Sequence, residues 1–325
     1  MTSLMEKNHV FEADVEMSLA GCPASVFFLE EPFIREYYVK AELAPEHLQE
    51  VLEFAKIMNS RFDYRVLAWH LYRHYALLQG YMEQPLPQLL EPFGVESGKL
   101  YLLVGLSLLP VIEARVQREH LPTQFAVDAC KRLGPLPFYY EVAHDGHFGI
   151  KPESLRFLLH YRDQAMFRIG RFDFYLTKEF TYPEIYRKGS EIKAFCPEGW
   201  NIDANDEQTD KEDKIVRTTH IVTDGATLTG TPIDLVNGKA MKSEETIQLS
   251  DWTLVSKRGT DWMLHFHIPG GGGMKPELSR QSFRDAIAFF KKHFPDKPVS
   301  LIMSNSWIFN PDLMPYIPGS NMDWL

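Results

Sequence analysis

The sequence predicts an α+β protein, in which an all-helical N-terminal domain over residues 1–163 precedes a mixed α/β domain with a central twisted sheet over residues 164–325. Three observations support this fold class. Apolar residues recur with the period of an amphipathic helix up to about residue 161, and they alternate as in half-buried strands after residue 164. The length of 325 residues also exceeds what one hydrophobic core usually serves, so we expect two domains.

The first half is predicted to be mainly helical, with helices over residues 45–58, 62–78, 100–120, 126–133 and 152–161. In the first of them, Leu48, Val51 and Leu52 begin an i, i+3, i+4 stripe, which is typical of a helix with one buried face. Gly134 and the proline after it end the fourth helix. The apolar start of the third helix is interrupted at Glu113, so it is shorter than the roughly 20 apolar residues that cross a bilayer.

The second half is predicted to form strands over residues 166–176, 182–195, 214–222, 246–249, 262–268 and 299–303. The first strand changes phase near Gly170, where we expect a β-bulge. One strong helix is predicted over residues 276–293, and its apolar stripe consists of Phe283, Ala286, Ile287, Phe290 and Phe294. Several short strands around one helix indicate a mixed α/β layer.

Charge and targeting signals narrow the range of partners. The chain has 34 basic and 44 acidic residues, a net charge of -10, whereas proteins that bind nucleic acid are usually basic. The sequence contains neither a run long enough to span a membrane nor the apolar segment of a secretion signal. We therefore expect a cytoplasmic protein that binds neither nucleic acid nor membranes.

Cysteines and acidic residues give two further expectations. Cys22, Cys130 and Cys196 are far apart in the sequence and lack a C-x-x-C spacing, which favours reduced thiols over disulfides or a zinc site. The acidic run over residues 203–213 predicts a solvated loop. A calcium site is the alternative for this loop, although the loop lacks the glycine and the final glutamate of an EF-hand.

A run of four glycines follows the predicted strand over residues 262–268 and precedes the helix that begins near Pro276. Glycines have no side chains, so their backbone N–H groups can approach an anion closely. The N-terminal end of a helix adds exposed amides and a positive dipole. The segment therefore predicts a cradle for a phosphate or diphosphate, although flexible surface loops have the same composition. Neither a Walker loop nor a dinucleotide-binding fingerprint fits, because Gly-Lys-Ser/Thr and a βαβ unit are missing.

Acyl-CoA N-acyltransferases hold coenzyme A on such a strand, turn and helix, with the signature Arg/Gln-x-x-Gly-x-Gly/Ala. Here Gly271 and Gly273 fill the glycine places, and Ile268 stands where Arg or Gln is expected. Other matching segments are Phe167-Arg-Ile-Gly-Arg-Phe172, Gly230-Thr-Pro-Ile233, Gly238-Lys-Ala240, His267-Ile-Pro269, Ser282-Phe283, Phe294-Pro295, Ser306-Trp307, Asn310-Pro-x-Leu313 and Ser320-Asn321. With these motifs the chain resembles a bacterial family of acyltransferase-like proteins that joins a helical N-acyltransferase N-terminal domain to a GNAT-like C-terminal domain. The resemblance is stronger over residues 165–325 than over the helical half.

The resemblance implies an N-acyltransferase that moves the acyl group of acetyl-CoA or another acyl-CoA to a small-molecule or peptide amine, which attacks the thioester directly. It implies that His267, at the strand end, is the general base and that Tyr316 supplies the proton or hydrogen bond to the departing thiolate. The implied cofactor-binding residues are Ile268, Gly270, Gly271, Gly272, Gly273, Ser306 and Trp307. Structural alternatives remain for His267 as a strand residue that hydrogen-bonds its neighbour, and for Tyr316 and Trp307 as packing residues.

Other functions stay open from the sequence. A GNAT-like domain without the usual Arg or Gln could bind acyl-CoA without catalysis, or serve as a scaffold. His265 and His267 share one face of a strand and could bind zinc or iron, while His144 and His147 form a second pair in a predicted turn. A Ser or Cys hydrolase is disfavoured, because the sequence has no Gly-x-Ser-x-Gly elbow and no cysteine beside a histidine.

Overall fold

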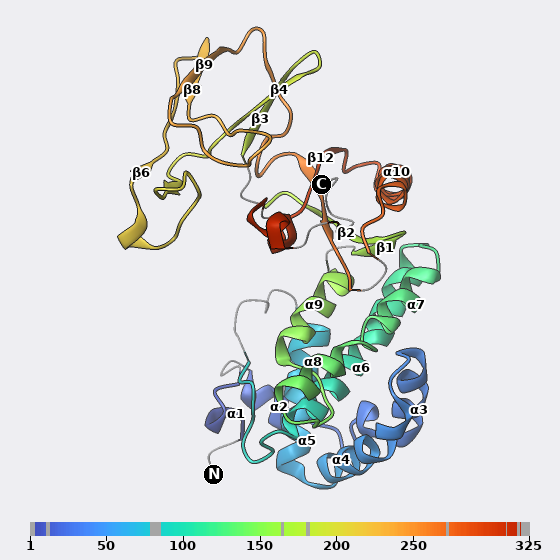
Figure 1. Ribbon diagram of the computed structural model, residues 1–325. Helices are drawn as coiled ribbons and strands as arrows, with labels where there is room; N and C mark the ends of the chain where they lie inside the picture. The colour runs from blue at the N-terminus through green and yellow to red at the C-terminus, as the bar shows by residue number, and fades with distance from the viewer. Residues whose placement is uncertain are drawn as a thin grey trace. The chain divides into compact units, whose positions relative to one another are not determined.

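The computed structural model describes residues 4–10, 14–78, 86–163, 166–179, 183–270, 273–309, 311–316 and 319. The chain forms two compact units, unit 1 over Met1–Arg168 and unit 2 over Ile169–Leu325 (Figure 1). Unit 1 is helical, and unit 2 is built from β-sheets and one long helix. The predicted α+β fold class is therefore confirmed.

Unit 1 contains the predicted helices and several more. The first predicted helix is a 3-10 turn, η2, that continues into α4, and the second is α5 with a π-helical end, η3. Helices α1, α2, α3 and α8 lie outside the predicted ranges. The bounds are α1 Leu4–Lys7, α2 Val15–Gly21, η1 Phe27–Leu29, α3 Glu31–Lys40, η2 Pro45–His47, α4 Leu48–Ser60, α5 Phe62–Tyr72, η3 Arg73–Leu77, α6 Ser97–Arg118, α7 Gln124–Lys131, α8 Leu136–Ala143 and α9 Pro152–Asp163.

Helix α6 forms the centre of unit 1. It is buried from Ser97 to Leu109 and contacts α3, α4, α5, α7 and α9. Glycine is required at Gly98, because a Cβ there would lie 2.5 Å from the ring of Tyr140. By length and composition α6 could cross a membrane, but 72% of its most apolar window is buried inside the protein, as expected of a core helix.

Polar groups of α6 connect it to its neighbours. The ammonium of Lys99 lies 2.7 Å from a carboxylate oxygen of Glu50 in α4. Arg115 Nη1 donates to the carbonyl oxygens of Tyr161 and Arg162, both at 2.9 Å. These carbonyls belong to the last turn of α9, where helical carbonyls have no partner within the helix and attract cations.

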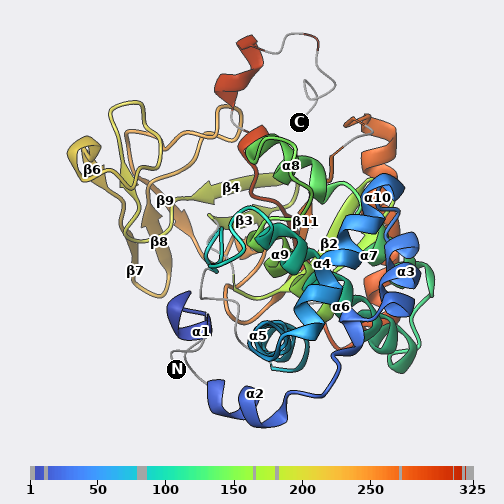
Figure 2. The same ribbon diagram turned by 90° about the horizontal axis from the view of Figure 1, so that it is seen from below.

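Unit 2 is organised around a four-stranded sheet with the strand order β1-β2-β11-β12. β11 pairs antiparallel with β2 and parallel with β12. Helix α10 lies beside this sheet and contacts β2 and β12 (Figures 1 and 2). The bounds are β1 Phe167–Ile169, which spans the unit boundary, β2 Phe172–Thr177, β11 Trp262–His267, α10 Pro276–His293 and β12 Val299–Met303.

Aromatic rings join α10 to one face of the sheet. The ring centroids of Phe172 and Phe266 lie 4.8 Å apart, and Phe283 of α10 lies 5.2 Å from each. The bounds of α10 agree with the predicted range 276–293. Its buried stripe differs from the predicted one, because Ile287 is exposed and the N-terminal half of the stripe is formed by the buried hydroxyl residues Ser279 and Ser282.

The β-bulge predicted near Gly170 is instead a tight turn. β1 ends at Ile169 and β2 begins at Phe172, so Gly170 and Arg171 connect two strands. Gly170 has a φ of 59°, and a Cβ there would lie 2.4 Å from Ser282 Oγ. Both the left-handed backbone and the close approach require glycine. The prediction was wrong because a short hairpin and a bulge produce the same change of phase in the alternation.

Between β2 and β11 the chain forms a group of short strands, residues 183–256, which we call the β insert. It contains three small sheets with the orders β10-β3-β4, β5-β6 and β7-β8-β9, and Figure 1 labels several of their strands. An apolar cluster of its own holds it together, formed by Tyr186, Phe195, Leu228, Ile247 and Trp252. The bounds are β3 Glu184–Lys188, β4 Glu191–Phe195, β5 Asn201–Ile202, η4 Glu212–Lys214, β6 Arg217–Thr218, β7 Ile221–Thr223, β8 Thr227–Gly230, β9 Glu245–Gln248 and β10 Thr253–Leu254.

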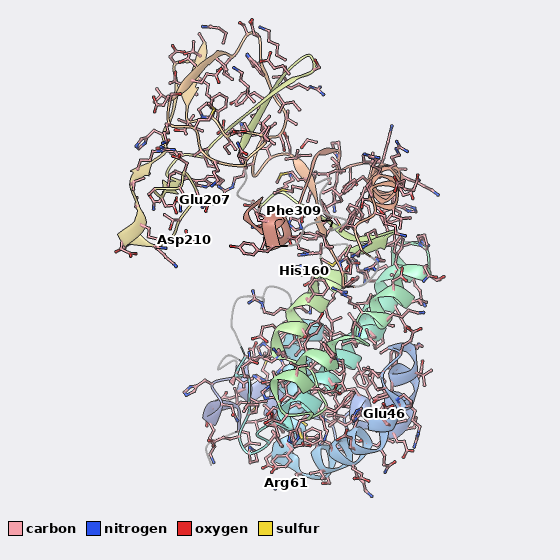
Figure 3. The ribbon with its side chains drawn as sticks, in the orientation of Figure 1. Glu46, Arg61, His160, Glu207, Asp210 and Phe309 are labelled. Atoms are coloured by element: carbon pink, nitrogen blue, oxygen red, sulfur yellow. The ribbon has the colours of Figure 1, made fainter. Side chains whose placement is uncertain are left out.

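The acidic run lies in the β insert, where Figure 3 labels Glu207 and Asp210. Asp210 is exposed, as expected for a solvated loop. Glu207 pairs with Lys239 at 3.1 Å, and the neighbouring Asp206 pairs with Arg217 at 2.9 Å. Within the described ranges, no three His, Cys, Asp or Glu side chains gather in a way that could hold a metal ion. The calcium alternative therefore gains no support.

The three cysteines are free thiols. Burial raises the pKa of the Cys130 thiol to about 12 and that of the Cys196 thiol to about 11. The thiolate is the reactive form of cysteine, so both thiols are unreactive near neutral pH. A cysteine nucleophile is therefore not available at either position.

Candidate active site

The end of β11 leads directly into the glycine run. The pairing of β11 with β12 is described as far as His265, which lies opposite Met303. The pairing with β2 continues to His267, which lies opposite Asp173. The last residues of β11 thus extend past the parallel pairing. An extended ligand could hydrogen-bond along this edge in the manner of an added strand.

The two faces of β2 and β11 differ in chemistry. Asp173 and Tyr175 of β2, and His265 and His267 of β11, occupy the face opposite the phenylalanines, since side chains alternate and these residues are register partners. The Tyr175 ring stacks on His267 at 5.6 Å and lies 4.9 Å from the ring of His265. We call these four residues the polar face.

Burial distinguishes the members of the polar face. Asp173 is 1% exposed and His265 is 2% exposed, whereas His267 is partly exposed. Burial raises the pKa of Tyr175, so its phenol stays neutral at physiological pH. His267 is the member that solvent reaches best, and imidazole is the side chain best suited to proton transfer near neutral pH. The structure places this predicted base at the strand end, beside a carboxyl group and a phenol.

After β11, the glycine run precedes α10 in the chain. Pro269 is buried and Gly270 is exposed, while Gly273 has a φ of 62°, which favours glycine. Gly271 and Gly272 lie outside the described residues. Pro276 opens α10, and no side chain caps its N-terminus in the described structure. The first-turn amides of this 18-residue helix therefore stand next to the glycine run, together with the positive end of the helix dipole.

Arg171 connects the β1–β2 turn to this loop, and the sequence analysis assigned it no role. Its Nε donates to the carbonyl oxygen of Gly273 at 2.5 Å, and its backbone N–H donates to Ser282 Oγ at 2.7 Å. Ser282 Oγ in turn donates to the Leu278 carbonyl oxygen at 2.8 Å. The matching segment Phe167-Arg-Ile-Gly-Arg-Phe172 contained the signal, but only the fold brings residue 171 to residue 273.

The residues after β12 lie in two short 3-10 helices, η5 Trp307–Phe309 and η6 Pro311–Tyr316. Phe309, labelled in Figure 3, has its ring 6.2 Å from that of Phe266 in β11, so η5 reaches the apolar side of the strand. Ser306 precedes η5 and accepts a hydrogen bond from the Ile308 N–H at 3.4 Å. The Trp307 side chain lies outside the described part of the chain. Tyr316 is 82% exposed at the end of η6.

The structure therefore assembles only part of the predicted site. His267 ends β11, and Ile268, Gly270 and Gly273 follow it closely in the chain. No described contact joins Tyr316 to β11. No described cluster of His, Cys, Asp and Glu side chains could hold a metal ion, so the metal alternative for His265 and His267 gains no support.

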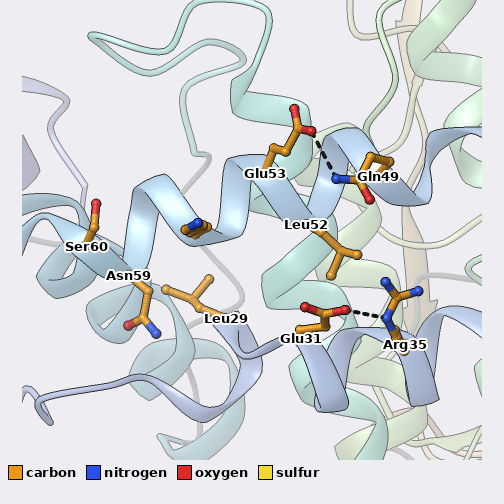
Figure 4. Close-up of a pocket in the computed structure, with 9 residues that line it drawn as sticks. Leu29, Glu31, Arg35, Gln49, Leu52, Glu53, Asn59 and Ser60 are labelled. Carbon is orange, nitrogen blue, oxygen red and sulfur yellow. Dashed lines mark hydrogen bonds and ion pairs between the residues drawn. The ribbon is translucent and has the colours of Figure 1, made fainter.

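A hollow of about 610 Å³ lies elsewhere, in unit 1, between η1, α3 and α4 (Figure 4). Much of its polar lining is already paired: Arg35 with Glu31 at 2.7 Å, and Gln49 with Glu53 at 3.0 Å, on the outer surfaces of the helices. Its lining includes neither a histidine nor a glycine loop. The strand end and loop of unit 2 are the better candidate for chemistry.

Residues 166–322 match the family model of the GNAT-like C-terminal domain. Among solved structures, the chain is similar to an acyltransferase in complex with decanoyl-CoA and teicoplanin, with 16% identity, a TM-score of 0.56, and 98% of this chain and 77% of that chain covered. An acyltransferase in complex with decanoyl-CoA matches at 16% identity and a TM-score of 0.55, over 98% of this chain and 78% of that chain. An acyltransferase in complex with CoA and 10C-Teicoplanin matches at 15% identity and a TM-score of 0.56, over 98% and 77%.

No curated protein matches the chain. At identities this low, the structural likeness shows a shared fold, and it extends over both units. Residues 166–322 therefore match a GNAT-like C-terminal domain, as the motifs implied, and the shared fold includes the predicted helical N-terminal region.

Proposed function

We propose, on the premise that residues 166–322 form a GNAT-like C-terminal domain, that the chain is an acyl-CoA-dependent N-acyltransferase. One observation carries this proposal. β11, flanked by an antiparallel and a parallel neighbour, is followed in the chain by the glycine run and then by a helix whose N-terminus has no side-chain cap in the described structure. This arrangement presents backbone amides and a positive dipole, which bind a diphosphate.

In this proposal, acetyl-CoA or another acyl-CoA is the co-substrate. Its diphosphate lies on Gly270, Gly271, Gly272 and Gly273 and on the first turn of α10, and its thioester lies along the end of β11 near Ile268. The similar structures cited above are complexes with decanoyl-CoA or CoA, which supports testing long acyl chains as well as acetyl.

The reaction is direct aminolysis of the thioester. The amine nitrogen attacks the carbonyl carbon, the C–N bond forms and the C–S bond breaks, and the CoA sulfur leaves as a thiolate. His267 takes the proton that the nitrogen loses, and a backbone N–H at the end of β11 stabilises the negative charge that develops on the carbonyl oxygen. Tyr316 would protonate the thiolate. Its phenol is 82% exposed and no described contact joins it to β11, so this role requires η6 to approach the strand end.

The acceptor in this proposal is a small-molecule or peptide amine. Teicoplanin in one of the similar structures supports an acceptor of this size. Ser306 and Trp307, which follow β12, are proposed to border the pantetheine or acceptor pocket.

Isothermal titration with CoA, acetyl-CoA and decanoyl-CoA, followed by thiol-release assays with a panel of amines, tests the proposal. We expect binding of CoA and amine-dependent release of free thiol. Binding without release for any amine would favour a non-catalytic acyl-CoA-binding protein. Absence of binding would refute both functions.

Gly271→Glu locates the site, because it adds a bulky carboxylate to the loop where phosphates are proposed to bind. We expect the variant to lose measurable CoA binding. Gln248→Glu is the control, since it adds one negative charge at an exposed position of β9. Unchanged CoA affinity in Gly271→Glu would remove the diphosphate from the glycine loop.

A further inference from the structure

We propose that Arg171 is the phosphate-contacting cation of the glycine loop, delivered from the β1–β2 turn. The inference rests on the proposed function, because it names a binding residue for the same co-substrate. The starting point is position 268. The signature expects Arg or Gln there, but the chain has Ile268, whose side chain has neither a charge nor a hydrogen-bond donor. A cation from another part of the chain supplies what position 268 lacks.

The turn that carries Arg171 is fixed against α10 by the backbone. Gly170 approaches Ser282 so closely that a Cβ would lie 2.4 Å from the hydroxyl. The Arg171 N–H donates to that same hydroxyl at 2.7 Å, and the hydroxyl donates to the Leu278 carbonyl one turn earlier in α10. Arg171 is therefore anchored to the helix that follows the glycine run, at a position independent of its own side chain.

The side chain reaches the loop itself. Arg171 Nε donates to the Gly273 carbonyl oxygen at 2.5 Å, across 102 positions of the sequence. A guanidinium is a planar fork of several N–H donors that remains charged at any physiological pH. The hydrogen bond to Gly273 therefore brings a permanent positive charge to the last residue of the glycine run.

The same contact also orients the loop. It holds the Gly273 carbonyl, and with it the peptide group that Gly273 shares with Met274, in one orientation. Gly273 has a φ of 62°, a conformation that an arginine contact helps to hold. The geometry thus assigns two tasks to Arg171: it holds the Gly273 peptide group in place, and its charge attracts the diphosphate.

CoA titrations of Arg171→Gln and Arg171→Lys at low and at high ionic strength test the assignment. We expect Arg171→Gln to weaken CoA binding by about tenfold or more, which is typical of losing a hydrogen bond to a charged group. We also expect its affinity to depend less on ionic strength than that of the unchanged protein, because one screened charge contact is gone. Arg171→Lys, which keeps the charge but not the fork, should retain an intermediate affinity and the original salt dependence.

Arg187→Gln is the matched control, since Arg187 is an exposed arginine of β3 in the same unit. It should bind CoA like the unchanged protein. CoA affinity in Arg171→Gln within about twofold of the original would overturn the proposal. A large loss with unchanged salt dependence would also overturn it, because a merely structural role predicts that result. If Arg171→Gln fails to fold, Arg171→Lys decides: reduced but measurable affinity with the original salt dependence supports the assignment, whereas affinity within about twofold of the original, or no measurable binding, overturns it.

This experiment separates the inference from the function on which it depends. Failure of the unchanged protein to bind CoA refutes the proposed function before any variant is made. If the unchanged protein and Arg171→Gln bind CoA with the same affinity and the same salt dependence, the proposed function stands. Only the role of Arg171 in binding CoA is then refuted.

Discussion

The two faces of β2 and β11 are made by the same short strands and serve different purposes. On one face, Phe172 and Phe266 pack against Phe283 of α10. On the other face, the register brings Asp173 opposite His267. The period of two in a strand allows adjacent residues to work separately, one in packing and the next in chemistry. We therefore expect that the face of β11 on which a side chain lies, rather than its distance from the loop, decides whether its substitution lowers stability or activity.

The largest effect is expected from His267→Ala on the polar face. Loss of the proposed base should lower kcat by about 10²- to 10⁴-fold, while CoA affinity and the melting temperature change little because His267 is partly exposed. Thiol-release kinetics and CoA titration measure the two quantities separately. His220→Ala, at an exposed histidine of the β insert, is the control. Equal turnover in His267→Ala and His220→Ala would remove His267 from the mechanism.

Phe266→Ala, one residue earlier, should have the opposite profile. It removes a ring that contacts Phe172 and Phe283 and leaves a cavity between sheet and helix. We expect a loss of about 3–5 kcal/mol in the free energy of unfolding, measured by urea denaturation. Val236→Ala, at a side chain that is 88% exposed, should cost almost nothing. A stable Phe266→Ala with a strongly reduced kcat would contradict the division of labour between the faces.

The smallest effect is expected from Tyr316→Phe. Its phenol is 82% exposed, and a thiolate with a pKa near ~8.5 leaves readily without a proton donor. We therefore expect kcat to fall by less than about tenfold. A fall beyond about 100-fold, with unchanged CoA affinity, would show that Tyr316 has a larger part in the reaction than its exposure indicates.

The sequence predicted α10 well because all its signals are local. Pro276 suits the first helical position, and Ala286 and Phe290 lie on one stripe. The prediction of one long strand around Gly170 was wrong, since the turn depends on a contact with Ser282 far along the chain. The alternation of apolar residues in the sequence does not show against which helix a turn packs.

The candidate site was likewise predictable only where its residues are close in the sequence. The glycine run and His267 are close in the sequence, so their proximity can be predicted without knowledge of the fold. Arg171 was missed because residues 171 and 273 meet only when β2 pairs with β11. Asp173 was missed for the same reason, since its place opposite His267 is set by strand register. Local patterns identify segments, whereas register and topology identify partners.

The β insert has a kinetic consequence. β2 ends at Thr177 and its partner β11 begins at Trp262, so the pairing that creates the polar face closes a long loop. Loop closure over many residues slows folding, although each doubling of the loop adds only about 0.6 kcal/mol. During synthesis, β2 leaves the ribosome well before its partner exists, and the insert, with its own apolar cluster, can collapse in the interval. The pairing of β2 with β11 would then form late in folding, and shortening the insert should speed refolding more than it alters equilibrium stability.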